Sequence, residues 1–341
     1  LLIVGYTITG GFNAVCVTDL VQSIVMTGAL AIVLIYGISR AGGWTAVMDN
    51  AAALPGYLSL TSTFDVASGS EVKYNFLTIF STAAWGLGYF GMPHILVRFM
   101  AIEDEKKLVL SRRIASVWVV IAMTAGVLIG IVGLGMTKAG ALDTLTGSNS
   151  ETIIVRIAGI ISQHNALTAL IAGIILAGIL AATMSTADSQ MLAAASGVSQ
   201  NIVHDFLKIK ISEKTNLLIA RLTIVGIAIV SIFLARNPDS SVFKIVSFAW
   251  AGFGGAFGAV VLCSLFWKRC NLAGAIAGII SGGATVFIWK YLVRPLGGIL
   301  DIYELLPAFI VSLIFIIVVS LLTKAPDEEI VREFEAAGKK A

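Results

Sequence analysis

Residues 309–322 read FIVSLIFIIVVSLL, an apolar run that only two serines interrupt. A strand of a membrane β-barrel would alternate apolar and polar residues over about ten positions, and this run does not alternate. The run instead fits a helix that crosses the apolar core of a bilayer, which needs about 20 such residues. We therefore place a helical span over 304–323 and read the rest of the chain outward from it.

The composition of the whole chain agrees with this reading. Of its 341 residues, 57% are hydrophobic and only 13% are charged, whereas a soluble domain carries about 25% charged residues. So few charges cannot cover a surface that faces water on all sides. The net charge of +3 is also too small to indicate a polyanionic partner. An ordinary soluble enzyme, a disordered chain and a nucleic-acid-binding protein are excluded.

Further segments are long and apolar enough to span a membrane. Residues 1–8 look like the tail of another such helix, so we expect the chain to start inside a hydrophobic segment. Lys and Arg concentrate in alternate loops, which the positive-inside rule places in the cytoplasm. The long loops over 41–74 and 137–163 then lie outside, and each is predicted to hold a short amphipathic helix. The predicted spans are 18–39, 75–100, 113–136, 165–200, 216–235, 241–267, 272–293 and 304–323.

The span over 75–100 contains residues that break helices. Residues 85–94 read WGLGYFGMPH, with three glycines and Pro93 inside an apolar segment. Proline removes a backbone donor, and glycine costs about 1 kcal/mol relative to alanine in a helix interior. The pattern predicts a discontinuous helix, which in transporters offers unpaired backbone groups to a substrate. Trp85 and Tyr89, one turn apart, share a face before the break; a kinked packing helix is the alternative.

The span over 165–200 carries a polar stripe. Residues 181–190 read AATMSTADSQ, and Asp188 lies beside the stripe. Carbonyl and hydroxyl oxygens suit a hard cation, and sodium is the monovalent ion that fits them. The hydroxyls could instead bond back to carbonyls one turn earlier, but this alternative does not account for a carboxylate at such depth. The residues on the stripe are Ala182, Ser185, Thr186 and Ser189.

Asp19 lies near the start of the span over 18–39, at a depth compatible with Asp188. We expect the two carboxylates to approach one cation or to share one proton. The alternative is that Asp19 is a first-turn acid, which the helix dipole stabilises.

Several of these stretches resemble the sodium/solute symporter family and, within it, the bacterial proline carriers. The resemblance implies an all-α polytopic membrane protein with a core of two inverted five-helix repeats, here without most of the first repeat. It further implies that 1–39 ends the first repeat, 40–74 is an extracellular loop and 75–267 is the second repeat. Residues 268–323 would be two accessory helices and 324–341 a cytoplasmic tail. The matching stretches are GGFNAVCVTD (10–19), WGLGYFGMPHILVRF (85–99), LAATMSTADSQML (180–192) and VSFAWAGFGGAFGAVVLCSLFWKR (246–269).

The resemblance also implies roles for individual residues. A sodium ion would bind the Ala182 carbonyl and the Ser185 and Thr186 hydroxyls. A second cation or proton site would involve Asp19, Asp188 and Ser189. Substrate would bind at Trp85 and Tyr89, with Pro93 shaping the break. Met92 stands where well-known proline carriers have glutamine.

The expected function is secondary active transport in the cell membrane: sodium-coupled symport of a small organic solute, L-proline first, by alternating access. Sodium is the expected cofactor, and the expected partners are the solute and the lipid bilayer, without nucleic acid or an obligate protein partner. The alternatives are a proton-coupled carrier using Asp19 and Asp188, a symporter of another amino acid or carboxylate, and a non-transporting membrane sensor module. The sequence shows no catalytic triad, metal cluster or phosphate loop, so we do not expect an enzyme.

Overall fold

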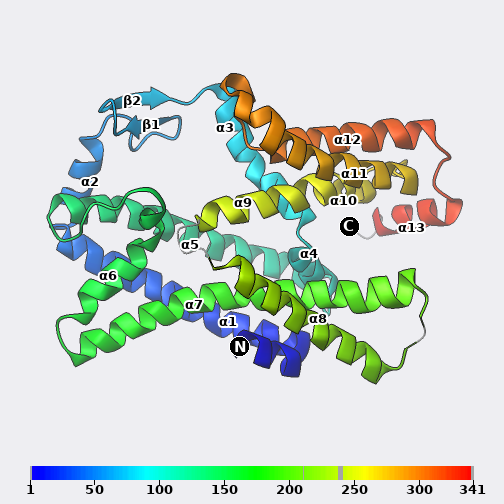
Figure 1. The fold of residues 1–341 in the computed structure, drawn as a ribbon, viewed down its shortest axis with the longest axis horizontal. Helices are drawn as coiled ribbons and strands as arrows, with labels where there is room; N and C mark the ends of the chain where they lie inside the picture. Colours follow the sequence, from blue (N-terminus) through cyan, green and yellow to red (C-terminus); the bar gives the residue numbers. More distant parts are fainter. Residues whose placement is uncertain (1, 210, 237–240, 339–341) are drawn as a thin grey trace. The chain divides into compact units, whose positions relative to one another are not determined.

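The computed structural model describes residues 2–209, 211–236 and 241–338. Within them, seven helices are long and apolar enough to cross a membrane, and each overlaps a predicted span. Figure 1 shows their arrangement along the chain. The chain is therefore a multi-pass membrane protein with an all-helical transmembrane part. The seven candidate spans are Ile3–Arg40, Lys107–Lys138, Ala166–Phe206, Glu213–Leu234, Val242–Phe266, Leu272–Leu296 and Leu305–Leu322.

The first element, α1 (Leu2–Arg40), consists of two helices that meet at a kink at Gly11. The expected helix tail over 1–8 and the expected span over 18–39 lie on opposite sides of this kink, and the second helix begins before residue 18. Gly11 has φ 62°, a left-handed conformation that glycine adopts without steric penalty. The two helices therefore meet at a single residue and need no loop. Residue 1 lies outside the described residues.

The predicted span over 75–100 is a discontinuous helix, as the glycines and proline indicated. It consists of α3 (Phe76–Ala83), the 3₁₀ helix η1 (Ala84–Gly91) and α4 (Pro93–Met100). Each piece is too short to span a bilayer alone, which explains why this segment is absent from the seven long helices.

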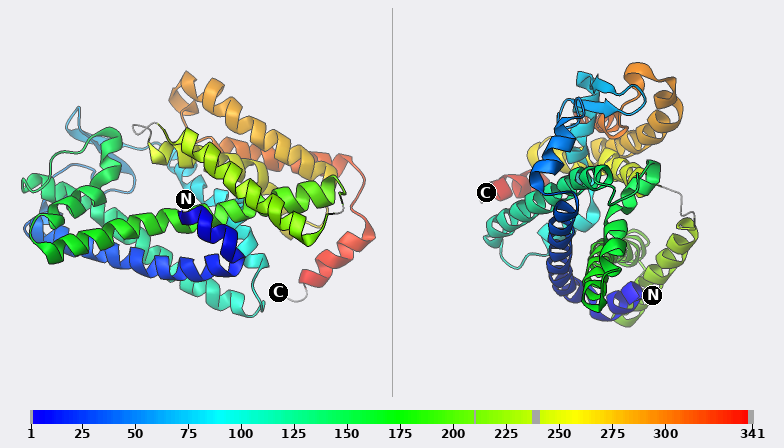
Figure 2. Two further views of the ribbon diagram at one scale, coloured as in Figure 1. Left: turned by 60° about the horizontal axis from the view of Figure 1, so that its bottom comes forward. Right: turned by 90° about the vertical axis from the view of Figure 1, so that its left-hand side faces the viewer.

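The chain divides into two compact units. In the first, α1 and α7 (Ala166–Ser196) run side by side in opposite directions in both Figures 1 and 2. A Cβ atom on Gly178 would lie 2.6 Å from Ala29 Cβ, so the glycine permits this close approach. The predicted short helices are confirmed as α2 (Trp44–Ala52) and α6 (Ile153–Ser162). The other helices of this unit are α5 (Lys107–Lys138), η2 (Gly147–Thr152), η3 (Gly197–Phe206) and α8 (Glu213–Leu234).

The second unit contains the broken helix and the C-terminal helices. Helices α11 (Leu272–Ile288) and α12 (Leu305–Leu322) form a hairpin in which buried Gly274, Gly278 and Gly282 face α12. Ser312 Oγ donates to Gly278 O across this contact at 2.9 Å. The other helices are α9 (Val242–Phe253), η4 (Gly254–Gly258), α10 (Ala259–Phe266), η5 (Trp289–Val293), η6 (Arg294–Leu296), η7 (Gly298–Leu300) and α13 (Glu328–Gly338).

A short β-hairpin in the 41–74 loop was not predicted. It pairs β1 (Ser62–Asp65) with β2 (Ser70–Lys73). Its turn includes Gly69 at φ 64°. Asp65 closes the turn by accepting hydrogen bonds from the Ser68 amide and hydroxyl, which lower the pKa of the Asp65 carboxyl.

The predicted tail over 324–341 is described as far as Gly338, where α13 ends. Its last residues, 339–341, lie outside the described residues.

Candidate functional site

The proposed sodium ligands gather around one carbonyl of α7. Ser185 Oγ donates to Ala182 O at 3.1 Å, and Thr186 Oγ1 donates to the same oxygen at 3.3 Å. The back-bonding that the sequence left as an alternative is therefore present. It also places both hydroxyl oxygens within 3.3 Å of the Ala182 carbonyl oxygen. A cation entering here would replace two weak internal hydrogen bonds, so this donor set fits sodium.

The carboxylate of Asp188 is fully buried, and its partner comes from α1. The Tyr6 hydroxyl donates to Asp188 Oδ2 at 2.6 Å. Ser189 Oγ lies 3.4 Å from Asp188 Oδ1 and donates to Ser185 O at 2.9 Å. Sequence reasoning missed Tyr6, because nothing in its neighbourhood marks it as facing a carboxylate 182 positions along the chain.

Asp19 lies within electrostatic range of both Tyr6 and Asp188. Gln22, one turn further along α1, faces the Tyr6 hydroxyl. Its Oε1 atom is buried and has no hydrogen-bond partner among the described residues. A buried acceptor without a donor is rare in native proteins, and it would suit a cation. The structure thus brings Asp19 and Asp188 into one polar cluster, while their role as a second cation or proton site stays a prediction.

The residues predicted for substrate lie on the broken helix, in an aromatic cluster. Trp85 stacks on Phe243, Trp250 and Tyr303, with ring centroids 5.4–5.7 Å apart. The rings of Tyr89 and Trp250 pack in a T shape with centroids 4.7 Å apart, and half of the Tyr89 surface is exposed. Trp250 Nε1 donates to Trp85 O at 3.0 Å. This bond ties the indole on α9 to the backbone of the broken helix.

The glycines of the broken helix are contact sites. A Cβ atom on Gly88 would overlap the Trp250 indole, and one on Gly91 would overlap the Phe253 carbonyl. The kinked helix with close glycine contacts, which the sequence left as an alternative, therefore coexists with the aromatic cluster. Pro93 is the first residue of α4, where its missing N–H leaves no hydrogen bond unmade. Met92, just before it, is 3% exposed.

The two groups of candidate residues belong to different compact units. The cation candidates lie in the first unit and the substrate candidates in the second. The contacts described above for each group lie within its own unit.

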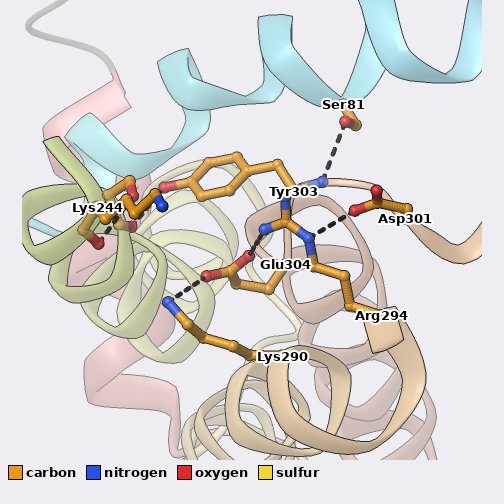
Figure 3. A network of polar contacts seen from close by, with 8 residues as sticks. Ser81, Lys244, Lys290, Arg294, Asp301, Tyr303 and Glu304 are labelled. Carbon is orange, nitrogen blue, oxygen red and sulfur yellow. Dashed lines mark hydrogen bonds and ion pairs between the residues drawn. The ribbon is translucent and has the colours of Figure 1, made fainter. Parts of the chain in front are cut away.

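A charge cluster around the buried Glu304, beside the aromatic rings, was missed by sequence reasoning (Figure 3). Glu304 is 1% exposed and pairs with Lys290 and Arg294. Lys290 and Glu304 lie in the last and first turns of two predicted spans, and Arg294 lies in the loop between them. Charges at such positions normally face water, so nothing in the sequence indicated that they pair. Burial, together with the nearby Glu304 charge, raises the pKa of the adjacent Tyr303 hydroxyl, so Tyr303 stays a neutral hydrogen-bond donor.

Within the described residues, seven apolar spans, a helix broken at glycines and a proline, and a polar stripe in an apolar helix place the chain in the discontinuous-helix class of multi-pass membrane proteins. The sequence matches the profile of the sodium:solute symporter family over residues 1–282. The chain belongs to this family, as the resemblance of its motifs indicated.

Curated relatives support the assignment. The chain is 39% identical over 333 residues to the osmoregulated proline transporter OpuE of Bacillus subtilis (strain 168), covering 98% of this chain and 64% of the relative. It is 38% identical over 333 residues to the sodium/proline symporter of Escherichia coli (strain K12), covering 97% of this chain and 62% of that one. The chain thus spans less than two thirds of the length of these relatives.

A solved structure shows the same fold. It is described as a substrate-bound outward-open state of a Na⁺-coupled sialic acid symporter, and it aligns with a TM-score of 0.70 at 17% identity. The alignment covers 96% of this chain and 66% of that one. The predicted transporter fold is therefore confirmed.

Proposed function

We propose that the protein is a sodium-coupled symporter of a small organic solute in the cell membrane, and that L-proline is the first candidate for this solute. The observation that carries the proposal is the convergence of the Ser185 and Thr186 hydroxyls on the Ala182 carbonyl within an apolar helix. The named activities of the proline-transporting relatives support the substrate. In this proposal the protein is a transporter and not an enzyme, and its repeats follow the boundaries expected from the sequence, with 75–267 as the second repeat.

In this proposal, one group of residues binds the sodium ion and another binds the solute. The three oxygens of α7 replace part of the hydration shell of sodium, while Trp85 and Tyr89 offer flat apolar surface with a polar edge to the solute. One sodium ion crossing about 100 mV gains about 2.3 kcal/mol. A tenfold sodium gradient adds about 1.4 kcal/mol. Together these suffice for an accumulation of several hundredfold of a neutral solute.

The test is uptake of labelled proline into proteoliposomes that contain a full-length protein carrying this sequence. An inward sodium gradient is compared with a potassium gradient and with a pH gradient. Accumulation of proline that requires sodium supports sodium as the coupling ion and proline as the substrate. Sodium-stimulated binding of another amino acid or carboxylate, without proline uptake, would replace the substrate and keep the ion. No effect of sodium on any solute would overturn the proposal.

Removing either hydroxyl should weaken sodium binding. We expect Ser185→Ala and Thr186→Ala each to raise the half-saturating sodium concentration about tenfold, because each loses a hydrogen-bonding oxygen worth about 1–1.5 kcal/mol. The measurement is uptake as a function of sodium concentration. Thr183→Ala is the matched control, since Thr183 Oγ1 donates to Ile179 O on the same helix but lies outside the stripe. Equal sodium dependence in all three variants would contradict the assignment.

The proton-coupled alternative rests on the buried Asp188 and its hydrogen bond to Tyr6. If protons drive transport, Asp188→Asn should reduce uptake under a pH gradient to background, because an amide cannot carry the proton. If sodium drives transport through the α7 oxygens, the same variant should keep uptake under a sodium gradient. Measuring both gradients in one preparation separates the two mechanisms. Tyr6→Phe, which removes only the donor to Asp188, is the companion variant.

A further inference from the structure

The charge cluster in the second unit is held from several sides (Figure 3). Arg294 Nη1 donates to Glu304 Oε2 at 3.0 Å, and Lys290 Nζ lies 3.4 Å from Glu304 Oε1. Arg294 Nε also donates to Asp301 Oδ1 at 2.8 Å. The positive charges of Lys290 and Arg294 balance the negative charges of Asp301 and Glu304. A buried carboxylate needs such partners, so the pairing ties η5 and η6 to the residue that caps the start of α12.

Tyr303, the neighbour of Glu304, connects this turn to the broken helix. Its backbone N–H donates to Ser81 Oγ on α3 at 3.2 Å, and its hydroxyl donates to Ser247 O on α9 at 2.7 Å. Its ring stacks on Trp85 with centroids 5.7 Å apart and an interplanar angle of 19°. The turn is packed further by Ile302 and Leu306, which contact Ala84 of η1.

We propose that Glu304 is a positioning residue for the substrate: by fixing the turn, it holds Tyr303 against Trp85. Helices α11 and α12 would thereby help to set the affinity of a site to which they contribute no proposed ligand. The inference rests on the proposed function of Trp85. Its physical basis is preorganisation, since a ring already held in place loses less conformational freedom when a solute binds.

The experiment uses the full-length protein in proteoliposomes and compares Glu304→Gln with Asp301→Asn. Both variants remove one carboxylate that pairs with Arg294, but Asp301 is 58% exposed and Glu304 is 1% exposed. We expect Glu304→Gln to raise the KM for proline about tenfold, the equivalent of ordering one or two side chains. The maximal rate and the half-saturating sodium concentration should stay within about twofold of wild type, and Asp301→Asn should leave the KM unchanged.

Tyr303→Leu removes the stacked ring and leaves the charges in place, so it tests the same contact if Glu304→Gln fails to fold. It should reproduce the higher KM, whereas Tyr303→Phe, which keeps the ring, should have a smaller effect. A spectroscopic readout accompanies the kinetics. Glu304→Gln should shift the tryptophan emission, and the shift should disappear in a Trp85→Phe background.

The outcomes are separable. If the wild type takes up proline but Glu304→Gln and Tyr303→Leu change only thermal stability, the cluster is structural and the inference is overturned. If the wild type takes up no solute, the proposed function fails and the emission of Trp85 decides whether Glu304 positions the ring. An unchanged emission then overturns the positioning role as well.

Discussion

Gly88→Ala should lower solute uptake by about 100-fold. The new methyl group would overlap the Trp250 indole, and relief of the clash requires Trp250 to leave the Trp85 carbonyl to which it donates at 3.0 Å. Overpacking costs about 1–3 kcal/mol, and the lost hydrogen bond adds about 1 kcal/mol. The displaced indole also carries the edge contact with Tyr89, so both candidate substrate residues are disturbed.

Gly86→Ala is the matched control for this prediction. A Cβ atom on Gly86 has no neighbour within 4 Å, although the residue lies in the same 3₁₀ helix. Proline uptake and membrane abundance of the two variants are measured side by side. Equal uptake by Gly88→Ala and Gly86→Ala at equal abundance would show that the packing of Trp250 on the broken helix is irrelevant to transport.

Gly282→Ala should have the largest effect on stability. A Cβ atom there would overlap the Gly255 backbone carbonyl and lie 2.9 Å from Ser312 Cβ, so neither neighbour can yield by a side-chain rotation alone. We expect the free energy of unfolding to fall by about 3 kcal/mol or more. The measurement is the thermal unfolding midpoint of the detergent-solubilised protein. It is read from the temperature at which the monodisperse size-exclusion peak is lost.

At the adjacent Gly283, we expect the opposite effect of an alanine substitution on stability. Its Cβ atom would lie 3.8 Å from Ala256 Cβ, an ordinary contact, and the residue is in the same helix. Because alanine favours a helix over glycine by about 1 kcal/mol, Gly283→Ala should keep or raise the thermal midpoint. A similar fall in both variants would contradict the packing argument, since helix propensity alone cannot separate them.

The sequence by itself determined which segments span the membrane and where one of them breaks. Apolar runs such as 309–322 need no partner to show that they belong in lipid, because bilayer thickness alone fixes their length. The break over 85–94 was equally local, since Pro93 and its preceding glycines oppose a regular helix wherever they occur. The polar stripe of α7 was predicted from helical periodicity alone.

Other features depended on contacts between residues far apart in the chain, and only the tertiary structure decided them. The hydrogen bond from Tyr6 to Asp188 joins two helices, and the Trp85 stack draws its rings from η1, α9 and the turn before α12. Glu304 would be a solvated charge at a helix end if Arg294 were not folded back onto it. Hydrophobic length and helical period are properties of one segment, whereas the pairing of buried polar groups depends on which segments pack together.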